Sequence, residues 1–560
     1  MTTDSPFSAH LGTKYCPSDE EVLEIKAFLV EPTLRLKNLD DEIADLQKAI
    51  DKLKAERDSV ESFVDAHKAL ISPARRLPLD IIQEIFIACL PTHRNCVMSA
   101  SEAPVLLGRI CSSWRAISLS TPRLWSSLHI VDPAPHGDPI GASAVADRVT
   151  LRLATTKMWL ARSGHCPLSI SLKVGFEHSD DEQPLVTRSP FLQLLVQFAP
   201  RWQHIHLVTP PAVLEQIRHL TDADVPMLES VTLDATFTME DDLNAPLEWE
   251  SLGMLRGARI SSFSFPGSHF VPEHLPLKWH QLTTLSMLGS WRTWLPVGLE
   301  SEAILRALSQ CPRLQCCTLI VNDEIVSEIQ SEHPVVELAF LNTLEVHCAG
   351  NVNQAILFLL PRLSVPMLHK FVLRGHANKP SHHSLAPLVS VWTLLQDFDI
   401  QHNIFSKADL LETLRSLPCT IKRLVLGQAH ETSVLPASLD DDVLRLLTPS
   451  SDSPALCCPG LRTLLIRHGC LISDAALLRL ITARTEADTA LRRVLVAFTR
   501  RMTLDLDAYL TPFMNNGLEL SIVYYLGWLT DTSPWRGLND EPVDGTRAVV
   551  GDPNPHLLKW

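Results

Sequence analysis

The side chains best suited to chemistry are acidic residues, histidines and cysteines that lie close together in the sequence. Asp440, Asp441 and Asp442 could supply the carboxylate ligands that a divalent cation prefers. They come directly before the apolar residues Val443 and Leu444, and acidic residues are favoured at the first turn of a helix by capping and by the helix dipole. We therefore predict a helix start at these residues and no metal.

The histidines give no constellation for catalysis or metal binding. His382 and His383 lie in a polar stretch without further ligands at helical or turn spacing, which predicts a loop pair. His204 and His206 flank Ile205 on a predicted strand and should face away from the core. Phosphate-loop, dinucleotide, nucleophile-elbow and HExxH motifs are absent from the sequence. We expect a protein that is not an enzyme and that carries no cofactor.

The thirteen cysteines are an odd number and include no CxxC pair, which argues against zinc sites and a disulfide framework. Most of them lie in apolar segments, among them Cys89, Cys111 and Cys348. The pattern therefore predicts buried free thiols.

Composition excludes several classes of protein. The 560 residues are 46% hydrophobic and 20% charged, which is ordinary for a globular protein with more than one core. The net charge of -15 and the absence of a basic run argue against binding to nucleic acid or to an anionic membrane surface. We find no run of 18 apolar residues and no secretory leader, so we expect a cytoplasmic or nuclear protein.

Residues 74–128 predict a small helical domain. Leu77-Pro78 ends the preceding segment, and a first helix then carries an apolar stripe formed by Leu79, Ile82, Ile85, Phe86, Cys89 and Leu90. A second helix should carry Val105, Leu106, Ile110, Trp114 and Ile117, and a third turn should carry Leu124, Trp125 and Leu128. Three short helices make a small core, so some apolar residues should face a partner: Leu77, Pro78, Ile81, Ile85 and Trp125.

The pattern Leu77-Pro78-x-Asp80-Ile81-Ile82-x-x-Ile85-Phe86, followed by Cys111-x-x-Trp114-Arg115 and Thr121-Pro122-x-Leu124-Trp125, resembles an F-box. The stretch is similar to the large fungal set of F-box proteins, in which the F-box follows a leader helix. The resemblance implies docking on a Skp-type adaptor, which would attach a substrate receptor to a cullin-RING ubiquitin ligase. It implies adaptor contacts by Leu77, Pro78, Ile81, Ile82, Ile85, Phe86, Trp114, Pro122, Leu124 and Trp125. The polar insert from Pro91 to Pro104 departs from the family pattern, and an ordinary three-helix capping domain is the alternative.

A long helix should precede this domain. Residues 1–31 are expected to be a flexible tail, and residues 32–71 a helix whose seam residues are spaced alternately by three and four: Leu36, Leu39, Ile43, Leu46, Ile50, Leu53, Arg57, Val60 and Val64. That spacing is a coiled-coil heptad pattern. A lone helix with an apolar seam is marginal in water, so the seam needs a second copy or packing against the F-box-like domain, and both remain open.

The rest of the chain repeats one phrase of three apolar residues at positions one, four and six. It occurs eleven times, starting at Trp202, Leu228, Ile260, Leu282, Leu314, Leu341, Leu368, Leu395, Ile421, Leu461 and Leu491. From Leu314 to Ile421 the steps are 27, 27, 27 and 26 residues. Such a period predicts a solenoid in which each unit is one short strand plus a returning helix or turn.

The phrase resembles the leucine-rich repeat, and Ile472, Ser473, Asp474, Leu477 and Leu480 are placed as in its cysteine-containing subtype. The predicted fold class is α/β: a long helix and a small helical domain, followed over residues 145–532 by a leucine-rich-repeat-like solenoid with a curved, mainly parallel sheet. Further strands are expected at Leu128–Ile130, Leu168–Leu172 and Leu518–Ile522, and helices at Val145–Ser163, Glu302–Ser309, Asn353–Leu359, Lys407–Leu417 and Asp440–Leu447. Residues 533–560 should form a polar tail.

The outward-facing residues of the repeat strands form the predicted recognition surface for a protein substrate. They are Glu345, His347, Lys370, Arg374, Asp397, Asp399, Arg423, Arg467 and Arg493. The sequence thus predicts the substrate-receptor subunit of an SCF-type ligase, with a Skp-type adaptor and an unknown protein target as partners. The alternative is a non-catalytic repeat scaffold that acts without a ligase and assembles through residues 34–66.

Overall fold

The structure is a computed structural model. It describes residues 5–71, 73–132, 142–174, 188–235, 249–265, 272–287, 298–322, 334–349, 352, 355–375, 383–427, 438–449, 456–467, 471–486, 491–498, 500–525 and 547–550. The chain divides into two compact units, Met1–Ile85 and Phe86–Trp560.

The first unit is dominated by the helix α1 (Asp19–Leu70). A capping box fixes its start: Glu21 N–H donates to the Ser18 hydroxyl (3.4 Å), and Ser18 N–H donates to the Glu21 carboxylate (2.7 Å). Acidic residues Asp19, Glu20 and Glu21 fill the first turn, where the helix dipole favours them. The prediction of a tail to residue 31 is therefore wrong from Asp19 onward, and Pro32 lies inside the helix. The helix α2 (Leu79–Ala88) begins directly after Pro78, as predicted.

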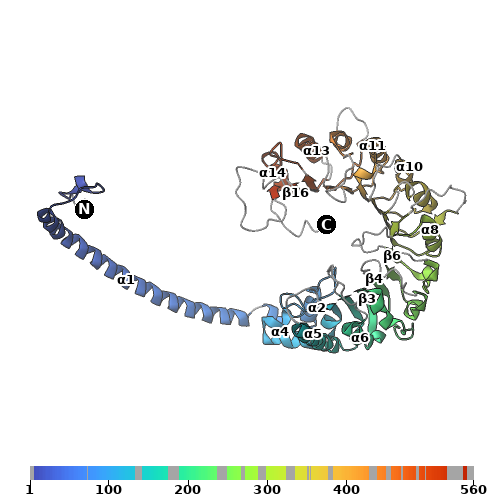
Figure 1. Ribbon diagram of the computed structural model, residues 1–560, viewed down its shortest axis with the longest axis horizontal. Helices are drawn as coiled ribbons and strands as arrows, with labels where there is room; N and C mark the ends of the chain where they lie inside the picture. Colours follow the sequence, from blue (N-terminus) through green and yellow to red (C-terminus); the bar gives the residue numbers. More distant parts are fainter. Residues whose placement is uncertain are drawn as a thin grey trace. The chain divides into compact units, whose positions relative to one another are not determined.

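The second unit is built on one long sheet. In the described part, fifteen strands pair in the order β1-β2-β3-β4-β5-β6-β7-β9-β11-β12-β13-β14-β15-β16-β17, and every pair up to β16 is parallel. The strands lie in the sheet in the order in which they follow one another in the sequence. The predicted α/β solenoid with a mainly parallel sheet is confirmed. Figure 1 shows the strands on the inner side of its curve and helices such as α8 and α11 on the outer side.

The strands of the sheet are β1 (Ser127–Asp132), β2 (Leu168–Val174), β3 (Trp202–Thr209), β4 (Ser230–Ala235), β5 (Ser262–Ser264), β6 (Thr284–Met287), β7 (Cys316–Val321), β9 (Thr343–Cys348), β11 (Lys370–Gly375), β12 (Asp397–Gln401), β13 (Arg423–Gly427), β14 (Thr463–Ile466), β15 (Arg493–Phe498), β16 (Glu519–Tyr525) and β17 (Arg547–Val550). A separate two-stranded sheet pairs β10 (Leu363–Ser364) with β8 (Val336–Glu337).

The helices of the second unit, after α2, are α3 (Leu107–Ile110), α4 (Ser112–Ser120), α5 (Ala142–Arg162), α6 (Pro190–Val196), α7 (Pro211–Leu214), α8 (Ser301–Ser309), α10 (Ala386–Val389), α11 (Lys407–Arg415), α12 (Asp441–Leu447), α13 (Asp474–Glu486) and α14 (Asp507–Asn515). The predicted helices near residues 145, 302, 407 and 440 are confirmed. The helix predicted at Asn353–Leu359 is a π-helical turn, Ala355–Leu359.

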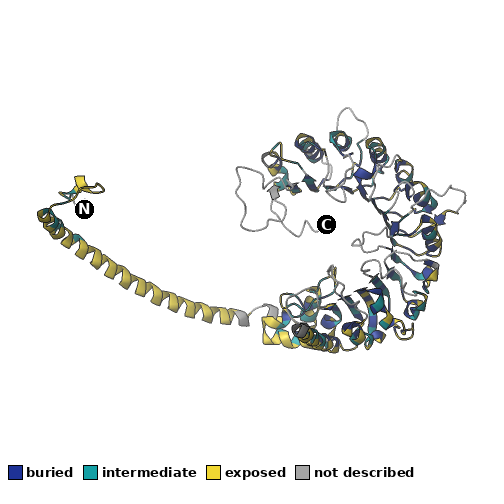
Figure 2. Cartoon of the chain, viewed as in Figure 1, coloured by how far each residue is buried: buried dark blue, intermediate teal, exposed yellow. Residues whose placement is uncertain are grey.

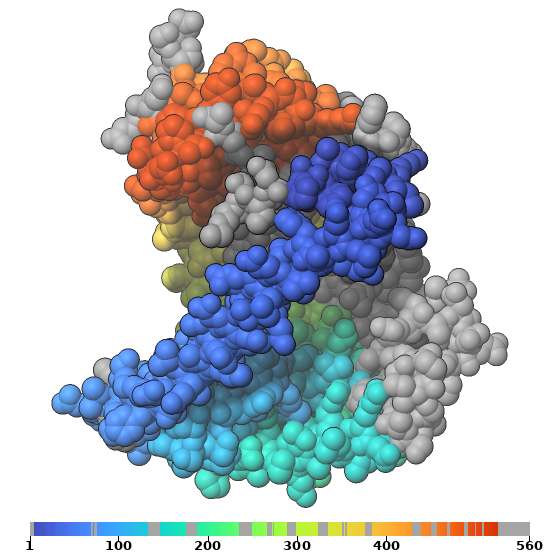
Figure 3. Space-filling view, turned by 90° about the vertical axis from the view of Figure 1, so that its left-hand side faces the viewer, coloured from blue at the N-terminus to red at the C-terminus, as the bar shows by residue number. Residues whose placement is uncertain are grey.

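All eleven predicted phrases give strands of this sheet, from β3 to β15, and their apolar residues are all buried. The middle residues of the phrases stand in register across the sheet, as Leu344, Phe371, Phe398, Leu424, Leu464 and Val494 illustrate. All residues of this row are buried, which makes the core continuous from repeat to repeat; Figure 2 shows much of the sheet as buried. Figure 3 shows the last repeats, in orange and red, as one packed mass.

The solenoid starts earlier than predicted. Strand β1 pairs in parallel with β2 from Ser127 to Asp132, so the sheet begins directly after the helical domain rather than near residue 145. At the other end, β17 lies inside the segment 533–560 that was predicted as a tail, and it pairs antiparallel with β16.

Candidate functional site

The start of α2 presents an apolar surface in the first unit. Leu77, Ile81 and Ile85 are exposed by 37%, 44% and 43%, and Leu79, which was not among the predicted adaptor contacts, by 55%. Pro78 is also exposed, and Ile82 is half-buried. Ile81 and Ile85 are one helical turn apart and share a face of the helix. The sequence could have indicated that Leu79 is exposed, because it follows Pro78 directly and is the first residue of α2.

The other five predicted adaptor contacts are partly exposed and partly buried. Pro122 is exposed and Trp114 half-buried, but Phe86, Leu124 and Trp125 are buried, so the prediction that these three contact an adaptor is wrong for this conformation. The Phe86 ring lies 4.8 Å from the Trp114 ring.

Trp125 is buried because α5 covers it. Its ring meets Trp159 edge to face at 4.8 Å, Arg162 lies over it at 4.6 Å, and its indole N–H donates to the Ser118 carbonyl at 2.8 Å. The sequence argument treated the helices as free-standing and therefore left Trp125 uncovered.

The predicted second helix is two helices. Cys111 has extended backbone angles (φ -156°, ψ 170°), so α3 ends and α4 begins around it. The break leaves Leu106 (41%) and Ile110 (55%) exposed, together with Leu119 (43%) on α4. The sequence placed Leu106 and Ile110 on the apolar stripe of one longer helix, whereas Leu106 precedes the one-turn helix α3 and Ile110 ends it.

The insert from Pro91 to Pro104 lies along the first strands of the sheet. The Asn95 side-chain oxygen accepts hydrogen bonds from the hydroxyls of Ser127 (2.9 Å) and Ser169 (2.8 Å), and its amide donates to Ser171 (3.1 Å). His129 N–H donates to the Cys96 carbonyl at 2.7 Å. The insert thus occupies hydrogen-bonding groups at the edge of the sheet, where an open strand would invite association. Sequence reasoning noticed the insert but not this role, which requires knowing which strand is the edge.

The predicted recognition residues fall into rows on the inner side of the sheet. Lys370, Asp397 and Arg423 stand side by side in register, and Arg493 follows after Thr463. These four are half-buried; Asp397 is acidic and the other three are basic. The Arg493 side chain forms an ion pair with Glu519 on β16 (3.2 Å).

A second group of predicted residues forms ion pairs. His347 Nε2 lies 2.8 Å from Glu345 Oε1, and Arg374 donates to Asp399 Oδ2 at 2.7 Å. The hydrogen bond from His347 lowers the pKa of Glu345, although burial opposes this shift. His347 and Asp399 are buried, so the prediction that they are exposed is wrong. His347 is paired with Glu345, and Asp399 is paired with Arg374.

Three arginines lie near Asp399. Burial lowers the pKa of Arg467, Asp399 acts against this shift, and the charges of Arg374 and Arg423 reinforce it. Three guanidinium groups therefore lie close enough to interact with one another and with Asp399. Guanidinium groups attract carboxylates.

Between the charged rows lies an apolar row that sequence reasoning missed. Val425, Leu465 and Leu495 face the inner side yet are only 0%, 3% and 4% exposed. The signal was present, because in β13, β14 and β15 apolar residues occupy consecutive positions, which indicates burial on both faces. In this conformation the polar rows, rather than the apolar row, are accessible to a target.

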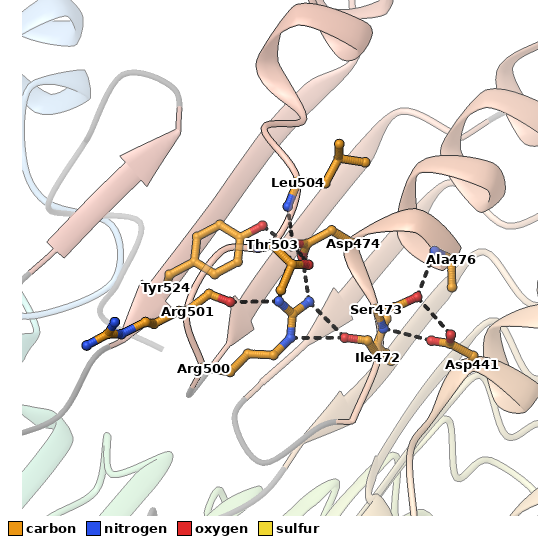
Figure 4. A network of polar contacts seen from close by, with 10 residues as sticks. All are labelled: Asp441, Ile472, Ser473, Asp474, Ala476, Arg500, Arg501, Thr503, Leu504 and Tyr524. Atoms are coloured by element: carbon orange, nitrogen blue, oxygen red, sulfur yellow. Dashed lines mark hydrogen bonds and ion pairs between the residues drawn. The ribbon is translucent and has the colours of Figure 1, made fainter.

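Asp474 is the most strongly bonded carboxylate in the described repeats (Figure 4). It accepts from Thr503 N–H (2.7 Å) and hydroxyl (2.6 Å), from Leu504 N–H (2.9 Å), from the Tyr524 hydroxyl (3.0 Å) and from Arg500. Burial alone would raise its pKa, but these hydrogen bonds outweigh burial and hold the pKa well below its usual value. A carboxylate satisfied by five donor groups is a structural tie between repeats.

The acidic triplet before α12 is a helix cap, as predicted. Asp440 accepts from Asp442 N–H at 3.0 Å, and Lys407 pairs with both Asp440 and Asp442. Among the residues that the structure describes, no group of three metal-binding side chains comes together. His204 and His206 are exposed on β3, as predicted, whereas His382 lies outside the described residues.

The cysteines are partly as predicted. Cys348 is buried, but Cys89 and Cys111 are exposed, at the end of α2 and at the break between α3 and α4. Within the described ranges, no helix combines the length and the apolar character that crossing a membrane requires.

No protein-family model matches the sequence, and no curated protein matches it either. The structure is similar to the crystal structure of the leucine-rich repeat-containing protein LegL7 from Legionella pneumophila, with 13% identity and a TM-score of 0.29 over 55% of this chain and 94% of that one. It is also similar to the crystal structure of the Rad7 and Elc1 complex in yeast, with 12% identity and a TM-score of 0.33 over 80% and 95% of the two chains. Likeness at this level says nothing about function, and the assignment of the fold rests on the strand registers above.

Proposed function

We propose that the chain is a non-catalytic substrate receptor of an SCF-type ubiquitin ligase. Its α2 region binds a Skp-type adaptor, and the inner side of its solenoid holds a protein target. The observation that carries the adaptor half is the exposed apolar set at the start of α2: Leu77, Leu79, Ile81 and Ile85. Three of these, Leu77, Ile81 and Ile85, belong to the pattern that resembles an F-box.

Exposed side chains of this size at one end of a ten-residue helix are best explained by a partner. Burying an aliphatic side chain contributes about 1.5–3 kcal/mol, so four of them supply a large part of a stable interface. In the second unit, Leu106, Ile110 and Leu119 offer further exposed apolar surface.

The target half rests on the arginines of the inner side. Arg374, Arg423 and Arg467 lie near Asp399, and guanidinium groups bind carboxylates in a bidentate manner. The target segment should therefore be rich in Asp and Glu, and it should contact the charged rows.

The test is co-purification of the full chain with a Skp-type adaptor after co-expression. The variant Leu77→Ala/Ile81→Ala/Ile85→Ala should lose the adaptor, because these exposed side chains are its contacts. The control Leu151→Ala changes a residue that is 70% exposed on α5 and should retain it. Recovery of as much adaptor with the triple variant as with the control Leu151→Ala would reject the adaptor proposal.

The alternative is a repeat scaffold without a ligase. The observations that favour it are the burial of Trp125 against α5 and the contacts of Asn95 with three strand serines, which are the contacts of an end cap. A wild-type chain that folds but recovers no adaptor would support this alternative.

A further inference from the structure

Helix α1 exposes the apolar seam that its heptad spacing predicted. The helix has 52 residues, and the side chains of Leu36, Ile43, Leu46 and Leu53 are exposed by 62%, 63%, 59% and 65%. Figure 2 shows the helix exposed along most of its length. Towards the N-terminus the same spacing falls on Val22, Ile25 and Leu29, and Pro32 occupies the d position between Leu29 and Leu36.

We propose that α1 pairs with α1 of a second copy of this chain as a parallel, in-register, two-stranded coiled coil. In heptad notation the a positions are Leu36, Ile43, Ile50, Arg57 and Val64, and the d positions are Leu39, Leu46, Leu53 and Val60. Most of the apolar a residues are β-branched, and three of the four d residues are leucine. That combination favours two parallel strands over three or four.

Arg57 determines the orientation. It is the one charged residue among the seam positions from Leu36 to Val64, and its guanidinium forms an ion pair with the exposed neighbour Asp58 (2.5 Å). In a parallel, in-register pair the two Arg57 residues meet at the same level, flanked by Glu56 at g and Glu61 at e of both helices. Four carboxylates then surround two guanidinium groups.

The antiparallel arrangement lacks this compensation. There the a residues of one helix face the d residues of the other, and every d residue from Leu39 to Val60 is apolar. Arg57 would be buried against leucine or valine, which is unfavourable for an unpaired charge. Parallel pairing also brings Arg35 at g next to Asp40 at e of the partner helix, an attractive pair.

The first experiment measures the mass of the full chain by sedimentation at micromolar concentration. We expect twice the 62.4 kDa of one chain. Leu46→Glu/Leu53→Glu places four carboxylates in the seam of the pair and should give monomers. The control Ala44→Glu/Ala55→Glu adds the same charge on the outer face of the helix and should leave the dimer intact. A wild-type monomer or trimer would overturn the proposal.

The second experiment tests orientation. Arg57→Glu should weaken the dimer by about tenfold or more, since six carboxylates then meet, and Glu56→Arg/Arg57→Glu/Glu61→Arg should restore it. An antiparallel pair would not be restored, because residue 57 would still face an apolar residue.

Energy transfer between fluorophores fused to the two N-termini gives an independent readout. It should be efficient for the parallel pair, whereas antiparallel helices of 52 residues would hold the ends about 78 Å apart. Inefficient transfer in a dimer would reject the parallel arrangement. These experiments do not involve an adaptor, so their outcome is independent of the proposed function.

Discussion

The side-chain oxygen of Asn95 accepts a hydrogen bond of 2.8 Å from the hydroxyl of Ser169, across 74 residues of sequence. The same oxygen accepts from Ser127 on the neighbouring strand β1. One side chain of the insert thus joins the first two strands of the solenoid. The insert from Pro91 to Pro104 therefore belongs structurally to the N-terminal end of the solenoid.

Asn95→Ala should destabilise the N-terminal end of the solenoid. The change removes three hydrogen bonds and leaves half-buried serine hydroxyls without this partner, which we expect to cost about 1–3 kcal/mol. Urea denaturation followed by circular dichroism measures the shift in midpoint. Thr92→Ala, an exposed residue of the same insert, is the control and should denature like the wild type. An unchanged midpoint for Asn95→Ala would show that the insert does not hold the strands.

Asp474→Asn should destabilise the C-terminal repeats in a pH-dependent way. The folded state holds the pKa of Asp474 below its ordinary value of 3.8, because hydrogen bonds from Arg500, Thr503 and Leu504 outweigh the effect of burial. The ionised carboxylate therefore stabilises the fold fully above about pH 4, and this contribution is lost as the pH falls further.

At pH 7 the amide variant should be less stable by about 3 kcal/mol, because Arg500 loses its charged partner. The difference from the wild type should narrow when thermal unfolding is repeated below pH 4. Asp222→Asn, at an exposed position, is the control and should show no such trend. A difference that stays constant from pH 7 to pH 3 would contradict this account of Asp474.

The repeats could be predicted because their signal is local and recurrent. The residues Leu344, Phe371 and Phe398 each sit in the middle of an apolar phrase, and a strand with that spacing can bury its apolar side in only one register. The eleven strands and the sheet they form therefore followed from the sequence.

The functional surfaces were predicted less completely because they depend on distant residues. Trp125 appears free until Trp159 is known to cover it, and Asp399 appears exposed until Arg374 is known to pair with it. Asn95 gave no signal, since its partners Ser169 and Ser171 lie more than seventy residues away. Contacts between repeats are set by the register of the sheet, which single residues do not reveal.

Arg423→Gln/Arg467→Gln should reduce binding of the target without affecting the adaptor. Both side chains are half-buried near Asp399, and losing two charged contacts should lower recovery of acidic target proteins by about tenfold or more. Quantitative mass spectrometry of proteins purified with the wild type and the variant makes the comparison. Arg445→Gln changes an exposed arginine of α12 and serves as control. Equal loss in both variants would indicate nonspecific attraction.

Thiol labelling should separate the cysteines by burial. Burial raises the pKa of Cys311 to about 12, so at pH 7.5 only on the order of one thiol in 10⁴–10⁵ is ionised, and the thiolate is the form that reacts. Burial also raises the pKa of Cys317, whose side chain has no exposed surface.

Cys16, Cys89, Cys111 and Cys419 are exposed and should be carbamidomethylated by iodoacetamide in the native protein within minutes, while Cys311 and Cys317 remain unmodified. Peptide mapping by mass spectrometry reads the pattern, and labelling in urea, where all sites should react, is the control. Modification of Cys317 as rapid as that of Cys419 would mean that the repeats around β7 open readily, contrary to the continuous core seen across the registers of β6, β7 and β9.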